Sequence, residues 1–481
     1  MSASHDVDIV ATQAFARYAA IREIRILVRN IASNVLGTIL PSIAALLAVP
    51  VIIHSLGLSA FGVFSLQVAM LFFFGLTDLG ISRAIVLLAF DNRFNSGTGW
   101  VRPYRVGVRY TTMMCGILCA ATPLVLVLRY AHPRGVDLHD MIVSSALIVP
   151  SAALMLFSLP QRAILEASEQ FFRLNLIRGP TAASIFIAPI IAFQFDKSLT
   201  SAAVSILVTR LISTAVYFFC SGAAAVHFRG LGSFAGMPHS ELATLRKNFL
   251  HRASWLGVTN LLSLAINYVD RFVLGALQST LAVGQFVIAQ EVVTKLWIAS
   301  GAVISAATPR LAMVKHQPDF KLMKSTSRHL TRLMIWTGLL PALGLMLFGE
   351  VLLKLWLGKS FTQASVFSLQ VMAAGVGLNN LSQVNFTLLQ VFEGEFGGAM
   401  LQVFNLAFAG VSLVILIPKF GVNGAAYAFS LRLLADCFIG RYLLSGKHDA
   451  ASELGVSNRF LIVVAALFAA ILCVCYHFTA V

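Results

Sequence analysis

A set of nine charged side chains within the long apolar stretches of this chain could do chemistry. The cations are Arg83, Arg210, Arg271, Lys295 and Arg432, and the acids are Asp78, Asp270, Glu291 and Asp436. A charge at membrane depth costs at least about 2.5 kcal/mol unless it faces a partner or a wet cavity. Arginine stays charged at any accessible pH and binds phosphate through two parallel hydrogen bonds. The set therefore predicts a cationic cavity suited to a diphosphate head group.

The spacing of these charges allows some local pairs. Glu291 and Lys295 are four residues apart, in the order that favours an ion pair on one helix face. Arg432 and Asp436 are also four apart, in the less favourable order. Arg210 lies near mid-depth of an apolar run that contains no acid. Salt bridges that only hold the helices together are the alternative to a binding site for each of these charges.

Two further pairs of charges are poorly placed to meet on one helix. Asp78 and Arg83 are five residues apart, and Asp270 and Arg271 are adjacent. Arg83 and Arg271 lie near the ends of their runs, where a long side chain can also reach the membrane surface. The acids beside the cavity are candidates for exchanging a proton or a sodium ion during a transport cycle.

The composition is that of a polytopic membrane protein. Hydrophobic residues make up 58% of the chain and charged residues 11%, against about 25% charged residues in soluble domains. The mean hydropathy is +0.84. No soluble basic patch is long enough for nucleic-acid binding, so the net charge of +15 is assigned to the membrane-topology bias. The 6 cysteines lack paired spacing, so we expect no disulfide and no metal site. We also expect no catalytic residue and no cofactor.

The apolar runs predict an all-α fold of about 12 to 13 transmembrane helices. Barrel strands would be shorter and would alternate. The runs fall at 30–53, 60–90, 106–128, 140–161, 174–194, 198–226, 252–276, 281–308, 330–353, 363–391, 396–417, 422–444 and 460–479.

Lysine and arginine counts in alternate loops set the expected orientation. The N-terminal tail and the even-numbered loops carry 24 of the 35 Lys and Arg residues, and the odd-numbered loops carry 6. Because cytoplasmic loops carry the positive excess, the N-terminus is expected in the cytoplasm. The predicted domains are a basic cytoplasmic tail (1–29), an N-lobe of six spans (30–228), a cytoplasmic linker (229–251), a C-lobe of six spans (252–445) and a segment with a cytoplasmic loop and an added span (446–481).

The two predicted lobes share a weak internal repeat. Gly62 and Phe64 match Gly284 and Phe286 at the same offset, and Leu56-Gly57 matches Leu274-Gly275 when a few extra residues are allowed. Six spans is an even number, so both halves have the same orientation and form a parallel repeat.

The residues of this repeat resemble a known family. The segments 56–64 (LGLSAFGVF) and 78–82 (DLGIS), then 267–275 (NYVDRFVLG), 283–286 (VGQF) and Pro309, are similar to the signatures of polysaccharide-biosynthesis flippases. These are the O-antigen-type transporters of the MATE-like MOP (multidrug/oligosaccharidyl-lipid/polysaccharide) exporter superfamily. The resemblance implies a V-shaped pair of six-helix lobes and alternating access. Family members commonly have twelve spans, so the run at 460–479 departs from the pattern.

The resemblance implies a non-enzymatic flippase of the bacterial inner membrane that moves undecaprenyl-diphosphate-linked oligosaccharide. Membrane lipids surround such a protein, and a polysaccharide polymerase and glycosyltransferases are candidate partners. Two alternatives stay open: a MATE-like ion-coupled exporter, and a membrane-embedded glycosyltransferase or polymerase. The short outward loops disfavour the enzyme, and no Walker A motif for ATP hydrolysis is present.

The orientation predicts which single cysteines are labelled from each side of the membrane. Cysteines near Arg102 and Lys321 should react from the cytoplasm, and cysteines at Ser279 and Lys359 from outside, because the basic loops stay in the cytoplasm. A membrane-impermeant thiol reagent on right-side-out and inverted vesicles checks this. Labelling at Ser279 from the cytoplasmic side alone would overturn the orientation.

Overall fold

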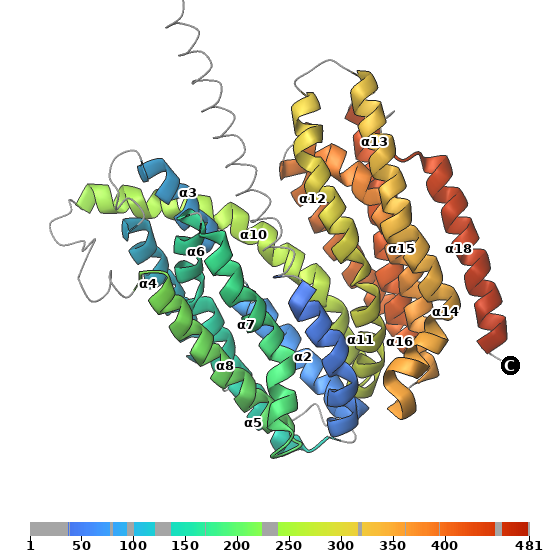
Figure 1. Cartoon of the computed structure of the whole chain (residues 1–481), viewed down its shortest axis with the longest axis horizontal. Coiled ribbons are helices and arrows are strands. Elements are labelled where there is room, and N and C mark those ends of the chain that lie inside the picture. Colours follow the sequence, from blue (N-terminus) through green and yellow to red (C-terminus); the bar gives the residue numbers. More distant parts are fainter. Residues whose placement is uncertain are drawn as a thin grey trace, which may run out of the picture.

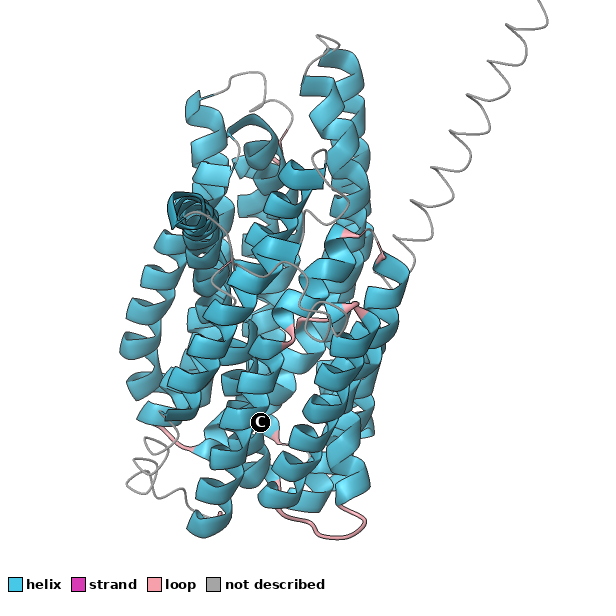
Figure 2. Ribbon diagram, turned by 90° about the vertical axis from the view of Figure 1, so that its left-hand side faces the viewer, coloured by secondary structure: helices cyan, strands magenta, loops and turns pink. Residues whose placement is uncertain are grey.

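The computed structural model describes a helical protein. The described residues are 37, 39–76, 80–93, 101–120, 136–168, 170–223, 239–315, 320–360, 362–393, 395–447 and 455–479, and they contain no strand (Figure 2). Asp78, the predicted tail 1–29 and the first part of the predicted linker lie outside these residues.

The described part of each predicted apolar run is mainly helical, although the run 60–90 is divided between α2 and α3 and the run 281–308 between α11 and α12. The N-terminal half contains a helix at Ile39–Leu56 followed by α2 (Leu58–Leu76), α3 (Ile81–Arg93), α4 (Val101–Ala120), α5 (Leu138–Phe157), α6 (Leu159–Ala167), α7 (Phe171–Ala192) and α8 (Leu199–Cys220). The C-terminal half contains α10 (His239–Leu277), α11 (Thr280–Val293), α12 (Leu296–Lys315), α13 (Phe320–Met334), α14 (Leu340–Leu357), α15 (Gln363–Glu393), α16 (Glu395–Lys447) and α18 (Asn458–Thr479). We call the first set the N-lobe and the second the C-lobe.

The lengths and hydropathies of these helices fit a multi-pass membrane protein. Within the described ranges, 7 helices are long and apolar enough to cross a membrane, and shorter apolar helices occur at Leu58–Phe73 and Asn458–Cys473. The long helix α16 covers two predicted runs, which are separated by a non-helical residue at Gly421 (φ 57°, ψ −129°). The predicted linker ends inside a helix, since residues 239–251 form the first turns of α10.

Figure 1 shows the helices in two bundles, with α3 to α8 on the left and α12 to α18 on the right. The helices α2 and α11 pack against each other between the bundles. The long helix α10 connects the bundles, since it contacts α3 in the N-lobe and α16 in the C-lobe. The all-α, two-lobe fold expected from the sequence is confirmed.

The two lobes meet most closely where α2 crosses α11. A Cβ atom on Gly62 would lie 1.8 Å from the carbonyl oxygen of Thr280, and a Cβ atom on Gly284 would lie 2.6 Å from the carbonyl oxygen of Leu58. Small residues let two membrane helices approach this closely. Each glycine thus contacts the residue four positions before the other glycine, so the two matched positions of the repeat pack on each other. We call this contact the glycine crossing.

Further contacts extend the glycine crossing along both lobes. A Cβ atom on Gly275 would lie 3.2 Å from Cδ1 of Leu66 in α2. The Nε1 group of Trp356, in α14, donates a 2.7 Å hydrogen bond to the carbonyl of Leu46 in the first helix. The lobes are therefore joined at the end of the molecule where α2 and α11 begin.

The last helix, α18, packs on the C-lobe. Asn385 of α15 accepts a hydrogen bond from the backbone N–H of Val456 (2.7 Å) and donates one to its carbonyl (3.3 Å). A Cβ atom on Gly377 would lie 3.0 Å from the ring of Phe468. The run that departs from the twelve-span pattern is thus a helix fixed to α15.

The glycine crossing predicts a large effect from one methyl group. Gly62→Ala should destabilise the protein by about 1–3 kcal/mol, because its Cβ must displace the Thr280 backbone. The matched control is Gly116→Ala in α4, where a Cβ would meet no atom within 4 Å and where alanine suits the helix better than glycine. Thermal unfolding in detergent compares the two variants. Equal melting temperatures would mean that the crossing is not a tight contact.

Candidate functional site

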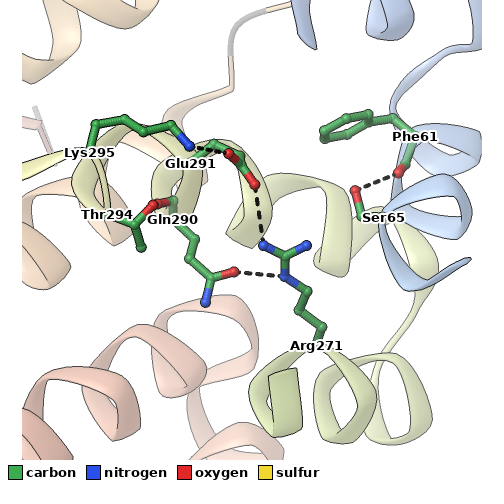
Figure 3. Close-up of polar contacts among 7 residues, drawn as sticks. All are labelled: Phe61, Ser65, Arg271, Gln290, Glu291, Thr294 and Lys295. Atoms are coloured by element: carbon green, nitrogen blue, oxygen red, sulfur yellow. Dashed lines mark hydrogen bonds and ion pairs between the residues drawn. The ribbon is translucent and has the colours of Figure 1, made fainter. Parts of the chain in front are cut away.

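Four side chains of α10, α11 and the turn between α11 and α12 form a connected polar network (Figure 3). Arg271 donates from Nε to Oε1 of Gln290 at 2.7 Å, and its Nη2 lies 3.4 Å from Oε1 of Glu291. The other carboxylate oxygen of Glu291 accepts from Nζ of Lys295 at 2.9 Å. We call Arg271, Gln290, Glu291 and Lys295 the Glu291 network. The predicted pair between Glu291 and Lys295 is present, and Arg271 joins it as a second cation.

The Glu291 network lies beside the contact between the lobes. Arg271 is buried and forms an ion pair with Glu291. Its guanidinium therefore does not extend to the membrane surface, as snorkelling would require. Its guanidinium lies 5.4 Å from the ring centroid of Tyr268, and Tyr268 stacks on Phe72 of α2 with centroids 6.1 Å apart. The network is thus linked to α2 through two stacked aromatic rings.

A second charged group lies between α10 and α16. Asp270 is 1% exposed, and neither of its carboxylate oxygens has a hydrogen-bond partner among the described residues. It interacts electrostatically with Arg432 and with Arg271. Arg432 is also buried, and its guanidinium lies 5.2 Å from the ring centroid of Phe429. The adjacent residues Asp270 and Arg271 therefore have different main partners, as expected on one helix.

The possible local pair between Arg432 and Asp436 is largely replaced by amide contacts. Asp436 accepts hydrogen bonds from Nδ2 of Asn379 and Nδ2 of Asn405, both at 3.0 Å. Arg432 and Asp436 still interact electrostatically, but the contacts that satisfy the carboxylate come from α15 and the first half of α16. The sequence spacing did not indicate these two asparagines.

Arg210 lies in the N-lobe, apart from the charges of the C-lobe. It is 3% exposed, its Nη2 donates to the carbonyl of Thr181 at 3.1 Å, and its Nε has no hydrogen-bond partner among the described residues. Its electrostatic neighbours are Tyr217 and Arg162, and Arg162 also interacts with Arg178. We call Arg162, Arg178 and Arg210 the N-lobe arginine cluster.

Arg162 and Arg178 both lie in helices of the N-lobe. Arg162 lies in α6, because the helix restarts at Leu159 after the break at Ser158 and continues to Ala167, beyond the predicted run 140–161. Arg178 lies in α7. Arg83 is exposed on α3. The predicted cations thus fall into separate groups, and no three of the described His, Cys, Asp or Glu side chains gather as metal ligands.

Comparison with known proteins supports the resemblance found in the sequence. No protein-family model matches the chain. A curated protein of Shigella flexneri, described as a "Putative O-antigen transporter", is 24% identical over 423 residues, which cover 87% of this chain and 97% of the relative. An inward-facing multidrug resistance MATE transporter of the MOP superfamily is 14% identical, with a TM-score of 0.67 over 87% of this chain and 98% of that one.

A second solved structure has the same level of structural similarity. The lipid II flippase MurJ, in an inward closed conformation, is 13% identical, with a TM-score of 0.67 over 92% of this chain and 98% of that one. At these identities the two structures establish the fold, which is that of MATE/MOP-type transporters.

The Glu291 network predicts unequal effects from its two ends. Glu291→Gln should lower the melting temperature more than Lys295→Gln, because it leaves Arg271 buried without its anion, a loss that costs about 3–5 kcal/mol in buried pairs. In Lys295→Gln, Glu291 keeps Arg271 as its partner. The double variant Arg271→Gln/Glu291→Gln should recover part of the loss. Thermal unfolding of the four proteins measures this, and equal losses in the two single variants would contradict the network.

Proposed function

We propose that this multi-pass membrane protein is a flippase of polyprenyl-diphosphate-linked oligosaccharide in the bacterial inner membrane. The carrier is undecaprenyl diphosphate, the N-terminus lies in the cytoplasm, and the lobes are residues 30–228 and 252–445. The observation that carries the proposal is Arg210, a buried guanidinium without a carboxylate partner among the described residues, in the fold shared with a lipid II flippase. The O-antigen transporter relative supports the same cargo class.

The N-lobe arginine cluster provides a site for the diphosphate. Arg162 and Arg210 are like charges that interact electrostatically, and each keeps an Nε group that lacks a partner among the described residues. A diphosphate placed between them would accept those hydrogen bonds and offset the repulsion between the two guanidinium groups. The head group then crosses between the lobes while the polyprenyl tail stays in lipid.

Alternating access requires the lobes to separate at the glycine crossing. The lobes are joined at the end where α2 and α11 begin, so transport to that side must break this contact. The Glu291 network is linked to α2 through Tyr268 and Phe72, which places charge where the movement would start. Lys295, Arg271, Arg432 and Arg83 remain candidate substrate contacts.

Asp270 is the leading candidate for ion coupling. It is buried between two arginines, and its carboxylate accepts no hydrogen bond from the described residues. Loss of Arg432 as a neighbour, through a movement of α10 relative to α16 within the C-lobe, would favour uptake of a proton or a sodium ion, since an isolated buried carboxylate is costly. Glu291, Asp436 and Asp78 are secondary candidates.

The alternatives are separated by what the purified protein does. A MATE-like exporter would move small solutes and leave the glycan lipid in place. A membrane-embedded glycosyltransferase or polymerase would extend the glycan chain. In liposomes containing fluorescent lipid-linked oligosaccharide, a flippase moves the head group between leaflets and leaves its length unchanged. Chain extension without movement would establish the enzyme, and association with a polymerase or glycosyltransferases is testable by co-purification.

Substitutions at Arg210 test the diphosphate site. Arg210→Ala should abolish glycan export at near-normal protein level, and Arg210→Lys should retain part of it, because lysine keeps the charge and loses the bidentate fork. The control is Arg173→Ala, an exposed arginine one turn from the start of the same α7 that carries Arg178. Membrane protein level and surface glycan are measured together. Low protein level in Arg210→Ala, with normal glycan export per molecule of protein, would make Arg210 a structural residue and overturn the diphosphate site.

A further inference from the structure

The C-lobe contains a polar cavity that is separate from the N-lobe arginine cluster. The cavity has a volume of about 340 Å³ and lies between α12, α15 and α16. Its polar lining includes Trp297, Asn379, Asn380, Gln383, Arg432 and Asp436. This volume is at the small end of the range of about 300–1,000 Å³ found for ligand sites.

Several buried polar atoms on this lining have no hydrogen-bond partner among the described residues. They are Nε1 of Trp297, both amide atoms of Asn380 and Nε of Arg432. Asn380 is 0% exposed and Arg432 is 6% exposed. Because a buried polar atom without a partner destabilises the folded protein, their concentration around one cavity indicates a ligand that supplies hydrogen bonds.

The backbone beside Asn380 has an unusual local form. The segment Ile335–Leu339 (η2) between α13 and α14 is a π-helix, a feature that recurs at functional sites. Within it, a Cβ atom on Gly338 would lie 2.6 Å from Nδ2 of Asn380. Glycine at this position therefore leaves the room that the Asn380 amide occupies at the cavity.

One wall of the cavity is aromatic. The Trp297 indole lies 6.2 Å from the ring of Phe429, measured between centroids. The Arg432 guanidinium lies over the same Phe429 ring, 5.2 Å from its centroid. Elsewhere on the lining, Gln383 donates to Asn379 (3.2 Å) and Asn379 donates to Asp436 (3.0 Å). The cavity thus combines an indole face with amide donors and acceptors.

The charges on the lining narrow the class of ligand. The guanidinium of Arg432 disfavours a metal cation, and the carboxylate of Asp436 disfavours a phosphate. A neutral molecule with many hydroxyl groups fits both, since each hydroxyl donates and accepts. Gly301 at the rim is exposed, and a Cβ there would meet no atom within 4 Å. Figure 1 shows α12, which carries Gly301, on the side of its bundle nearest the N-lobe.

We propose that this cavity binds a neutral sugar residue of the transported glycan, an inference that rests on the flippase function proposed above. The diphosphate then binds the N-lobe arginine cluster and the sugar binds the C-lobe, so one substrate bridges the two lobes. The C-lobe cavity accordingly selects among glycans, whereas the N-lobe cluster binds the part that all such lipids share.

The test compares two lipids on the purified full-length protein. The probes are undecaprenyl-diphosphate-linked oligosaccharide extracted from the source strain and sugar-free undecaprenyl diphosphate. The wild type should bind the glycan lipid at least about tenfold more tightly than the sugar-free lipid. This ratio corresponds to the binding free energy of one or two hydrogen bonds to charged or buried groups. Asn380→Leu should remove this difference by weakening only the glycan lipid. If Asn380→Leu does not fold, Trp297→Phe replaces it in the test. This variant keeps an aromatic ring, loses the indole N–H, and should likewise weaken binding of the glycan lipid only.

The control is Gln370→Met, which alters another buried amide of α15 outside the cavity and should keep the difference. Equal binding of the two lipids by the wild type, or an unchanged difference in both cavity variants, would overturn the sugar site. Either result leaves the flippase function intact if the liposomes still translocate the glycan lipid. Absence of translocation by the wild type would instead overturn the proposed function.

Discussion

The close approach of α2 and α11 is the constraint on which the arrangement of the two lobes depends. Gly62 and Gly284 occupy matched positions in the internal repeat, and each removes the side chain that would otherwise keep the two backbones apart. Because α2 is packed in the N-lobe and α11 in the C-lobe, the distance between them at this crossing sets the distance between the lobes. It thereby fixes where Tyr268 contacts Phe72 and where the Glu291 network lies. Two matched glycines of the repeat thus form the closest contact between the lobes.

The cost of burying charge explains how the two lobes differ. In the C-lobe, Glu291 forms ion pairs with two cations, and Asp436 accepts hydrogen bonds from two asparagines. These two buried carboxylates therefore have their partners within the protein. In the N-lobe, Arg210 has a single carbonyl contact and a neighbouring arginine. Hydrocarbon offers no solvation for such a group, and an anionic substrate would supply the balance. The asymmetry between lobes is consistent with a substrate whose charged part and sugar part are recognised separately.

The sequence predicted the helices and one charge pair, and it failed where the partner comes from a distant element. The run lengths located the helices because hydrocarbon thickness sets them, and the four-residue spacing of Glu291 and Lys295 is local to one helix face. Arg271 reaches Gln290 and Glu291 only because α10 and α11 pack side by side. The amides that bind Asp436 come from Asn379 and Asn405, 57 and 31 residues away. Arg162 lies just past the predicted run 140–161, because hydropathy does not reveal that the chain restarts a helix after Ser158.

The most direct measurement of the account is whether the lobes must part at the glycine crossing for a glycan lipid to be moved. In a variant lacking the native cysteines, Leu66→Cys/Gly275→Cys joins α2 to α10 at the point where a Gly275 Cβ would lie 3.2 Å from the Leu66 side chain. Translocation in liposomes should stop when a short reducible cross-linker joins this pair and resume on reduction. The control pair Gly377→Cys/Phe468→Cys, within the C-lobe, should permit translocation when joined. Undiminished translocation by the fully cross-linked Leu66–Gly275 pair would contradict the account.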